Sequence, residues 1–200
     1  MTGDSRDAGA ADGGVDLYWI PLGAGAGGAV VRWSGRVYER LAATFARRPR
    51  CALFHSALLV HVDGETTAIE MAPVWTKHGD RGVVSEGAVG ARFMGRSRWF
   101  RYEVRCWRGG SIPDSAAAVD GPVRVSDDAD RARRVLELVA DFPARTWGRD
   151  ELSTGEMWNS NSLASWVLVR AGLEIDAIGP PPGGRAPGWD AGIIVASRAR

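Results

Sequence analysis

Residues 52–71 have the sequence ALFHSALLVHVDGETTAIEM, in which two apolar stretches flank an Asp63-Gly64 pair. An Asp-Gly pair between such stretches is a strong signal for a β-hairpin, because both residues tolerate the positive φ angles of a tight turn. The first arm should cover residues 52–62 and the second residues 66–71. We therefore expect two antiparallel strands, with His55 on one arm and Glu70 on the other.

Other strands are predicted on either side of the hairpin. Residues 17–20 form a short apolar run that Pro21 closes, and residues 98–107 alternate large side chains with period two. Residues 192–196 are a further apolar run, which we expect to return to the sheet as the last strand. The predicted fold class is α+β, an antiparallel sheet with packed helices.

Three helices are predicted between and beyond these strands. Residues 35–47 repeat apolar side chains at helical spacing and end before Pro49. Ser126 can cap a second helix that Pro143 ends, and residues 163–171 form a third that Gly172 stops. We expect the third helix to pack on the sheet.

Composition limits the classes of protein and partner. The chain has 200 residues, with 25 Lys and Arg against 24 Asp and Glu, so its formal net charge is +1. This balance gives no electrostatic reason to expect nucleic acid or an acidic membrane surface as a partner. The length suits one domain, and we expect a disordered Gly- and Asp-rich tail over residues 1–15 and a single α+β domain over residues 16–200.

A cytoplasmic protein without a membrane span is expected. No stretch approaches the roughly 18 apolar residues that a bilayer span needs, and residues 1–15 lack the apolar centre of a signal peptide. Cys51 and Cys106 have no metal-binding spacing. Free thiols in a reducing compartment fit this pattern best.

Neither a metal nor an organic cofactor is predicted. Among the three histidines, His55 and His61 share a strand face, but six strand residues separate them by about 20 Å, which is too far to bind one ion. The run Gly23-x-Gly25-x-x-Gly28 has dinucleotide-binding spacing. No helix is expected to begin at Gly28, so we expect no nucleotide there.

The segment Trp158-Asn159-Ser160-Asn161-Ser162 lies directly before the third predicted helix. Exposed amides at a helix start favour negative charge on a nearby oxygen, which would help a serine act as a nucleophile. Asn and Ser are also the preferred N-cap residues, so the segment could equally serve only as a cap. The residues alone leave both interpretations open.

The order of these motifs resembles the circularly permuted papain-like superfamily, which includes NlpC-like, lecithin:retinol acyltransferase-like and PPPDE-type proteins. The resemblance rests on His55-Ser56-Ala57-Leu58-Leu59-Val60, on the hairpin that ends Ile69-Glu70-Met71-Ala72-Pro73, and on Asn159-Ser160-Asn161-Ser162-Leu163. In the family an Asn-Cys-x-x-Phe sequence begins the helix, and here Ser160 stands at the cysteine position. The chain is also similar to uncharacterised bacterial proteins with an Asn-Ser-Asn-Ser/Thr-Phe sequence.

This resemblance implies an amide or ester hydrolase or acyltransferase. Ser160 would be the nucleophile, His55 the base and Glu70 the group that orients the imidazole. Asn159 and Asn161 would support the oxyanion, and the acyl substrate would be a small molecule or a peptide. The alternative is a catalytically inactive papain-like domain that binds a peptide or acyl ligand in the same cleft.

A second group of candidate residues surrounds this site. Residues 183–190 are rich in Gly and Pro and include an arginine and a tryptophan, a composition that suits either a pocket lining or a tight turn. Trp158, Arg185 and Trp189 are the candidate substrate-binding side chains.

Overall fold

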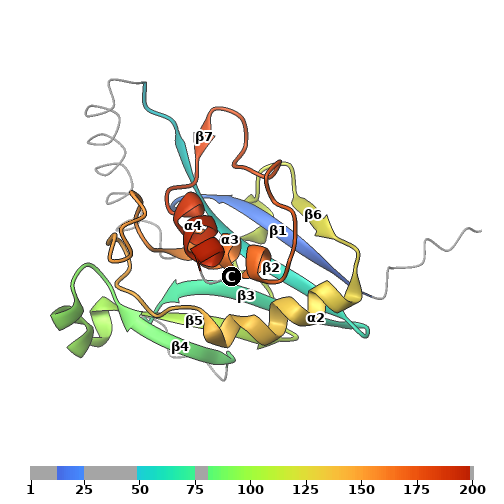
Figure 1. Ribbon diagram of the computed structural model, residues 1–200, viewed down its shortest axis with the longest axis horizontal. Helices are drawn as coiled ribbons and strands as arrows, with labels where there is room; N and C mark the ends of the chain where they lie inside the picture. The colour runs from blue at the N-terminus through green and yellow to red at the C-terminus, as the bar shows by residue number, and fades with distance from the viewer. Residues whose placement is uncertain (1–12, 25–48, 75–80, 199–200) are drawn as a thin grey trace, which may run out of the picture.

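The computed structural model describes residues 13–24, 49–74 and 81–198 (Figure 1). The predicted helix over residues 35–47 lies outside these ranges, as do Gly25, Gly28 and His78. The glycine-loop prediction therefore stays a prediction.

The described strands form a seven-stranded, mainly antiparallel sheet in the order β4-β5-β3-β2-β1-β6. Their bounds are β1 Gly13–Pro21, β2 Ala52–Val62, β3 Glu65–Pro73, β4 Val83–Ala88, β5 Arg101–Arg108 and β6 Pro122–Ser126. The two-residue β7, Gly184–Arg185, pairs in parallel with the start of β2. The predicted α+β class is confirmed.

The hairpin predicted from Asp63-Gly64 is present. Asp63 and Gly64 have positive φ angles of 51° and 75°, as the central residues of a tight two-residue hairpin turn require. The register places Leu58 opposite Ile69 and Val62 opposite Glu65. On its other side β2 pairs with β1, so the strand that carries His55 lies inside the sheet.

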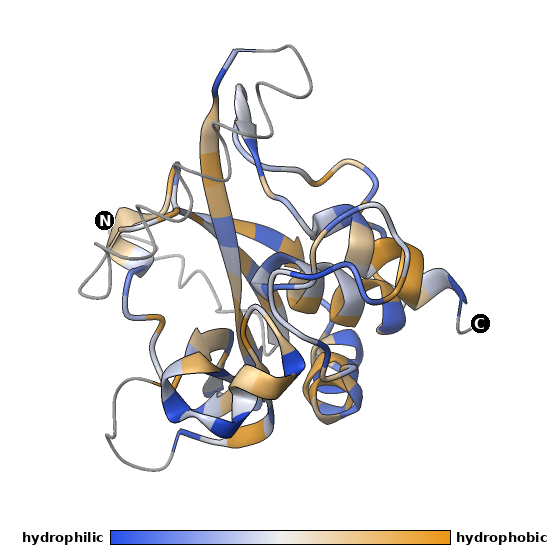
Figure 2. Ribbon diagram, turned by 90° about the vertical axis from the view of Figure 1, so that its left-hand side faces the viewer, coloured by the Kyte–Doolittle hydropathy of each residue, from blue (hydrophilic) through white to orange (hydrophobic). Residues whose placement is uncertain are grey.

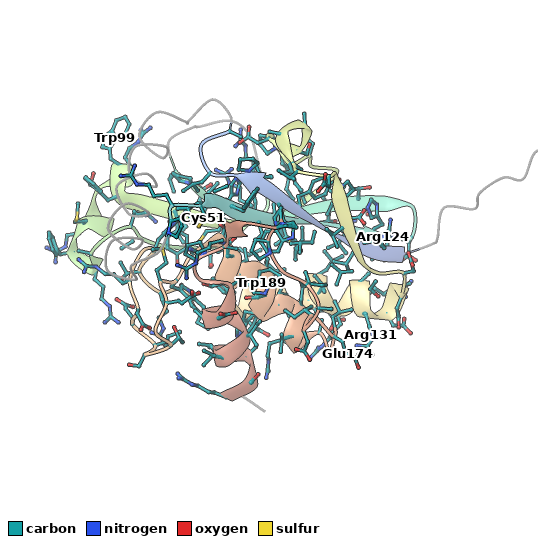
Figure 3. All side chains as sticks on the ribbon, turned by 90° about the horizontal axis from the view of Figure 1, so that it is seen from above. Cys51, Trp99, Arg124, Arg131, Glu174 and Trp189 are labelled. Atoms are coloured by element: carbon teal, nitrogen blue, oxygen red, sulfur yellow. The ribbon has the colours of Figure 1, made fainter. Side chains whose placement is uncertain are left out.

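Three α-helices of the described ranges lie on one face of the sheet, as Figure 3 shows from above. They are α2 (Ala129–Leu138), α3 (Ser160–Arg170) and α4 (Trp189–Arg198). The main core lies between these helices and the sheet; its largest fully buried side chains include Trp19, Trp158 and Tyr102. Helix α2 begins after Asp128, whose carboxylate accepts hydrogen bonds from the amides of Asp130 and Arg131, so the predicted cap at Ser126 is two residues early.

The predicted last strand is wrong, because residues 192–196 belong to helix α4. A run of five apolar residues is compatible with a buried helix or a strand, and its periodicity does not separate the two. As a helix, this segment packs directly on α3: a Cβ atom at Gly192 would overlap Ser165 Oγ and the Ser162 carbonyl oxygen. The edges of the sheet are β4 and β6 instead.

Other element boundaries also differ from those predicted. Helix α3 begins at Ser160, three residues before the expected start at residue 163, so Ser160 and Ser162 lie inside its first turn. Strand β1 begins at Gly13, so the last three residues of the expected 1–15 tail are ordered; a Cβ atom at Gly13 would overlap Ala129 at the start of α2. Strand β5 begins only at Arg101, because residues 98–100 form the short 3₁₀ helix η2.

The far face of the sheet carries a smaller second core of Ile20, Ala57, Ala68 and Ile112. Ile112 comes from the connection between β5 and β6. Strand β2 is therefore packed on both faces, with Leu58 and Val60 in the main core and Ala57 in the second. Within the described ranges, no helix is long and apolar enough to cross a membrane.

Candidate functional site

The start of helix α3 packs against strand β2 through Ser56. Its hydroxyl donates to the Ser160 carbonyl oxygen at 3.5 Å, and both residues are buried. Ser56 pairs in register with Trp19, which belongs to the main core. Side chains alternate along a strand, so the helix-facing positions of β2 are the even-numbered ones.

His55 therefore points to the opposite face of the sheet. It pairs in register with Ile20, which belongs to the second core. Burial lowers the pKa of the His55 imidazole from its ordinary value, and the nearby negative charge of Asp114 opposes that shift. The structure does not bring His55 to Ser160, because a one-residue step along a strand reverses the face. The expected Ser160–His55 pair is corrected accordingly.

Glu70 is bound by an arginine. Arg105 Nη1 lies 2.8 Å from Glu70 Oε1, and its Nη2 lies 2.9 Å from Glu103 Oε2. The Arg105 side chain is only 3% exposed, so these two carboxylates are what compensates its buried charge. Glu70 shares a face with His55, but no hydrogen bond joins them within the described residues. The predicted role of Glu70 behind the imidazole is not supported.

The Asn-Ser-Asn-Ser segment caps α3 and ties it to the loop before α4. Asn159 Oδ1 accepts from the amides of Asn161 and Ser162, and Ser162 Oγ accepts from the Asn159 amide in return, which makes a capping box. Ser162 Oγ donates to the Gly188 carbonyl at 2.8 Å. Asn159 and Asn161 both donate to the Pro187 carbonyl. Asn161 Nδ2 also donates to the Phe54 carbonyl, so both of its N–H groups are used, whereas Asn159 Nδ2 makes one hydrogen bond within the described residues.

The candidate substrate-binding side chains have separate structural surroundings. Trp158 is buried, stacks on Phe142 at 4.9 Å and donates to the Pro143 carbonyl. Trp189 is buried at the start of α4 with its ring 4.9 Å from that of Trp19. Arg185 is partly exposed and lies 3.8 Å from Glu156. The printed partners of the three side chains are different residues, and their role in binding a substrate stays a prediction.

Asn161 Oδ1 and Trp19 Nε1 are among the buried side-chain polar atoms that have no hydrogen-bond partner within the described residues; Ser85 Oγ on β4 is another. The orientation of the Asn161 amide is fixed, because its nitrogen donates to the carbonyls of Phe54 and Pro187 at 3.0 Å and 2.9 Å. Trp19 pairs with Ser56, two residues from Phe54 on the same face of β2. Asn161 and Trp19 are thus linked to successive even-numbered positions of β2, Asn161 through the Phe54 carbonyl and Trp19 through its register partner Ser56.

The structure also contains a polar network that the sequence did not indicate. On the far face, His61 Nε2 lies 2.9 Å from Asp16 Oδ2, and Thr66 Oγ1 lies 3.3 Å from His61 Nδ1. Arg124 Nε contacts the other Asp16 oxygen at 2.7 Å. These residues come from β1, β2, β3 and β6. In the sequence these residues are only single polar positions on separate strands. Which of them are neighbours depends on the order in which the strands pair, and above all on the pairing of β1 with β2.

In the described part of the chain, no group of His, Cys, Asp and Glu side chains could hold a metal ion. No disulfide joins Cys51 and Cys106, and burial raises the pKa of the Cys106 thiol. Comparison with protein-family models, curated proteins and solved structures gave no match.

Proposed function

We propose that this chain is a binding domain that lacks Ser-His-Glu catalysis and takes a peptide or an acyl amide as its ligand. The observation that carries the proposal is the unused pair, Asn161 Oδ1 and Trp19 Nε1, between the sheet and the start of α3. Buried polar groups are normally satisfied, and leaving one unpaired costs about 1–3 kcal/mol. An amide group offers both the donor and the acceptor that these two atoms lack.

The placement of His55 supports binding over catalysis. A serine nucleophile needs a base within hydrogen-bond reach, and the side chain that β2 presents to the start of α3 is Ser56, whose hydroxyl donates to the Ser160 carbonyl oxygen. A serine hydroxyl at that position cannot take the proton from Ser160. In this chain, too, a helix starts against the strand that carries the histidine, which is consistent with the resemblance to permuted papain-like proteins. Under this proposal the chain is a catalytically inactive relative of that superfamily.

The surroundings of the unused pair suit an amide ligand. Phe54, Trp19 and Trp189 are buried aromatic side chains of the same core, and the last two lie in ring contact. The loop before α4 covers this region and is held by the Asn159 and Ser162 hydrogen bonds. Access would therefore require movement of residues 185–189 away from the start of α3.

The proposal is tested by separating reaction from binding. Wild-type protein is treated with a fluorophosphonate, and Ser160 is examined by mass spectrometry; we expect no adduct and no turnover of activated esters. N-acetyl dipeptide amides and N-acyl amino acids of increasing chain length are then titrated, with the indole N–H resonance of Trp19 as the readout. We expect a saturable shift of that resonance.

The variant Trp19→Phe keeps a ring beside Trp189 but removes the donor, and it should weaken binding at least fivefold. Trp99→Phe, at an exposed position, is the matched control and should bind as wild type. A Ser160 adduct that requires His55 would reject the proposal in favour of an enzyme. A Trp19 resonance that none of the amides shifts would reject it in favour of a purely structural role, with a trapped water filling the unused pair.

A further inference from the structure

The segment between β4 and β5 forms a lobe that exposes large aromatic rings. It consists of the 3₁₀ helices η1 (Arg92–Arg96) and η2 (Arg98–Phe100), neither of which contains a buried residue. Phe93 is 75% exposed, Trp99 63% and Phe100 42%. Figure 3 shows Trp99 at one end of the molecule, away from the helices that cover the sheet. These rings add nothing to either core.

The lobe is positively charged although the chain as a whole is almost neutral. Residues 91–101 contain four arginines and no Asp or Glu. Arg92 is paired with Glu151 and Arg101 with Glu86. Arg96 and Arg98 have no carboxylate partner among the described residues, and Arg98 lies over the ring of Trp99 at 5.4 Å. In Figure 2, where this end faces the viewer, hydrophobic and hydrophilic residues lie side by side along the lobe.

We propose that this lobe docks the protein on an anionic lipid surface. Aromatic rings beside arginines suit the membrane interface, because the rings enter the boundary between head groups and acyl chains while the guanidinium groups stay with the lipid phosphates. The inference is independent of the proposed ligand site, which lies between the sheet and α3. It concerns a surface contact and not a membrane span.

The chemistry of the lobe favours lipid over the other partners. A second copy meeting it across a twofold axis would bring the same unpaired arginines face to face, which is unfavourable. A single-stranded nucleic acid would need a positive groove that follows its backbone over several nucleotides, whereas two unpaired arginines lie here beside projecting rings. A membrane surface with anionic head groups can pair with the two arginines and also accept the exposed aromatic rings.

Flotation with vesicles tests the inference on the full chain. We expect binding to vesicles of phosphatidylcholine mixed with phosphatidylserine, little binding to phosphatidylcholine alone, and loss of binding as salt is raised. The double variant Arg96→Gln/Arg98→Gln should bind about 30-fold more weakly, which corresponds to two basic side chains near an anionic surface. Phe93→Ser/Trp99→Ser should weaken binding at least tenfold, because it removes two exposed rings of the lobe; thermal unfolding of the same variant is measured in parallel to check that it folds.

Two matched controls lie elsewhere on the surface. Arg134→Gln on α2 and Val123→Ser on β6 remove an exposed arginine and an exposed apolar side chain, and both should bind vesicles as wild type. Equal loss in the controls would overturn the inference. So would a wild-type protein that stays unbound, one that dimerises through the lobe in sedimentation experiments, or one that binds single-stranded oligonucleotides more tightly than the vesicles.

Discussion

Ser160 and Ser162 lie two positions apart at the start of α3, and both are buried, but their hydroxyl groups have different surroundings. Ser162 Oγ accepts from the Asn159 amide at 3.2 Å and donates to the Gly188 carbonyl at 2.8 Å. Ser160 Oγ makes no hydrogen bond within the described residues; its contact with Ser56 is through its backbone carbonyl. The hydroxyl of Ser160, the predicted nucleophile, therefore makes fewer hydrogen bonds than that of Ser162.

This difference predicts opposite outcomes for two conservative substitutions. Ser162→Ala should lower the free energy of unfolding by about 1–3 kcal/mol, because it removes the capping box and leaves the Asn159 amide and the Gly188 carbonyl without that partner. Ser160→Ala should change it by less than about 0.5 kcal/mol. Urea unfolding of the two variants checks the prediction. Equal losses would show that the capping box contributes no specific stability.

Strand β2 shows what the sequence could and could not indicate at the scale of an element. Asp63-Gly64 predicted its hairpin because that pair sets a turn by local chemistry alone. The face of His55 was not predictable, because Leu58 and Val60 on one face and Ala57 and Leu59 on the other are all apolar, so no alternation marks the helix-packed side. The same limit applies to residues 192–196, a glycine followed by four apolar side chains, which fit a buried helix as well as a strand.

The contact between α3 and α4 makes Gly192 sensitive to the smallest substitution. Gly192→Ala should destabilise the protein by about 1–3 kcal/mol, because the added Cβ overlaps Ser165 Oγ and the Ser162 carbonyl and forces the helices apart. This loss should exceed the gain of up to about 1 kcal/mol that alanine gives within a helix. Calorimetric comparison with Ser197→Ala, at an exposed position of α4, provides the control. A stabilised Gly192→Ala protein would contradict the observed helix packing.

At the scale of the whole molecule, Glu151 joins the arginine-rich lobe to the body. Arg92 Nε lies 2.8 Å from Glu151 Oε1, and Thr146 Oγ1 donates to the same oxygen at 2.7 Å. The hydrogen bond from Arg92, followed by those from Thr146, outweighs desolvation and lowers the pKa of Glu151 from 4.5 to about 2. The folded protein therefore favours the ionised carboxylate more than the unfolded chain does.

Because the pKa of Glu151 is lowered on folding, its contribution to stability depends on pH in a defined range. The stabilisation is present above the unfolded pKa of 4.5 and should be lost as the pH falls toward about 2, since protonation then accompanies unfolding. Glu151→Gln should flatten the pH dependence of the urea midpoint in this window. Glu137→Gln, at an exposed ion pair of α2, should leave it unchanged. An unaltered slope in the Glu151 variant would show that the lobe is not held by this carboxylate.

The position of β2 has a consequence for how the protein opens. Its backbone is paired with β1 and β3, and its side chains are packed on both faces of the sheet. Fraying from an edge would expose β4 or β6 while leaving β2 protected. The amide hydrogens of Leu58 and Val60 should therefore exchange with solvent deuterium only through global unfolding, and their protection measures the stability of the entire fold.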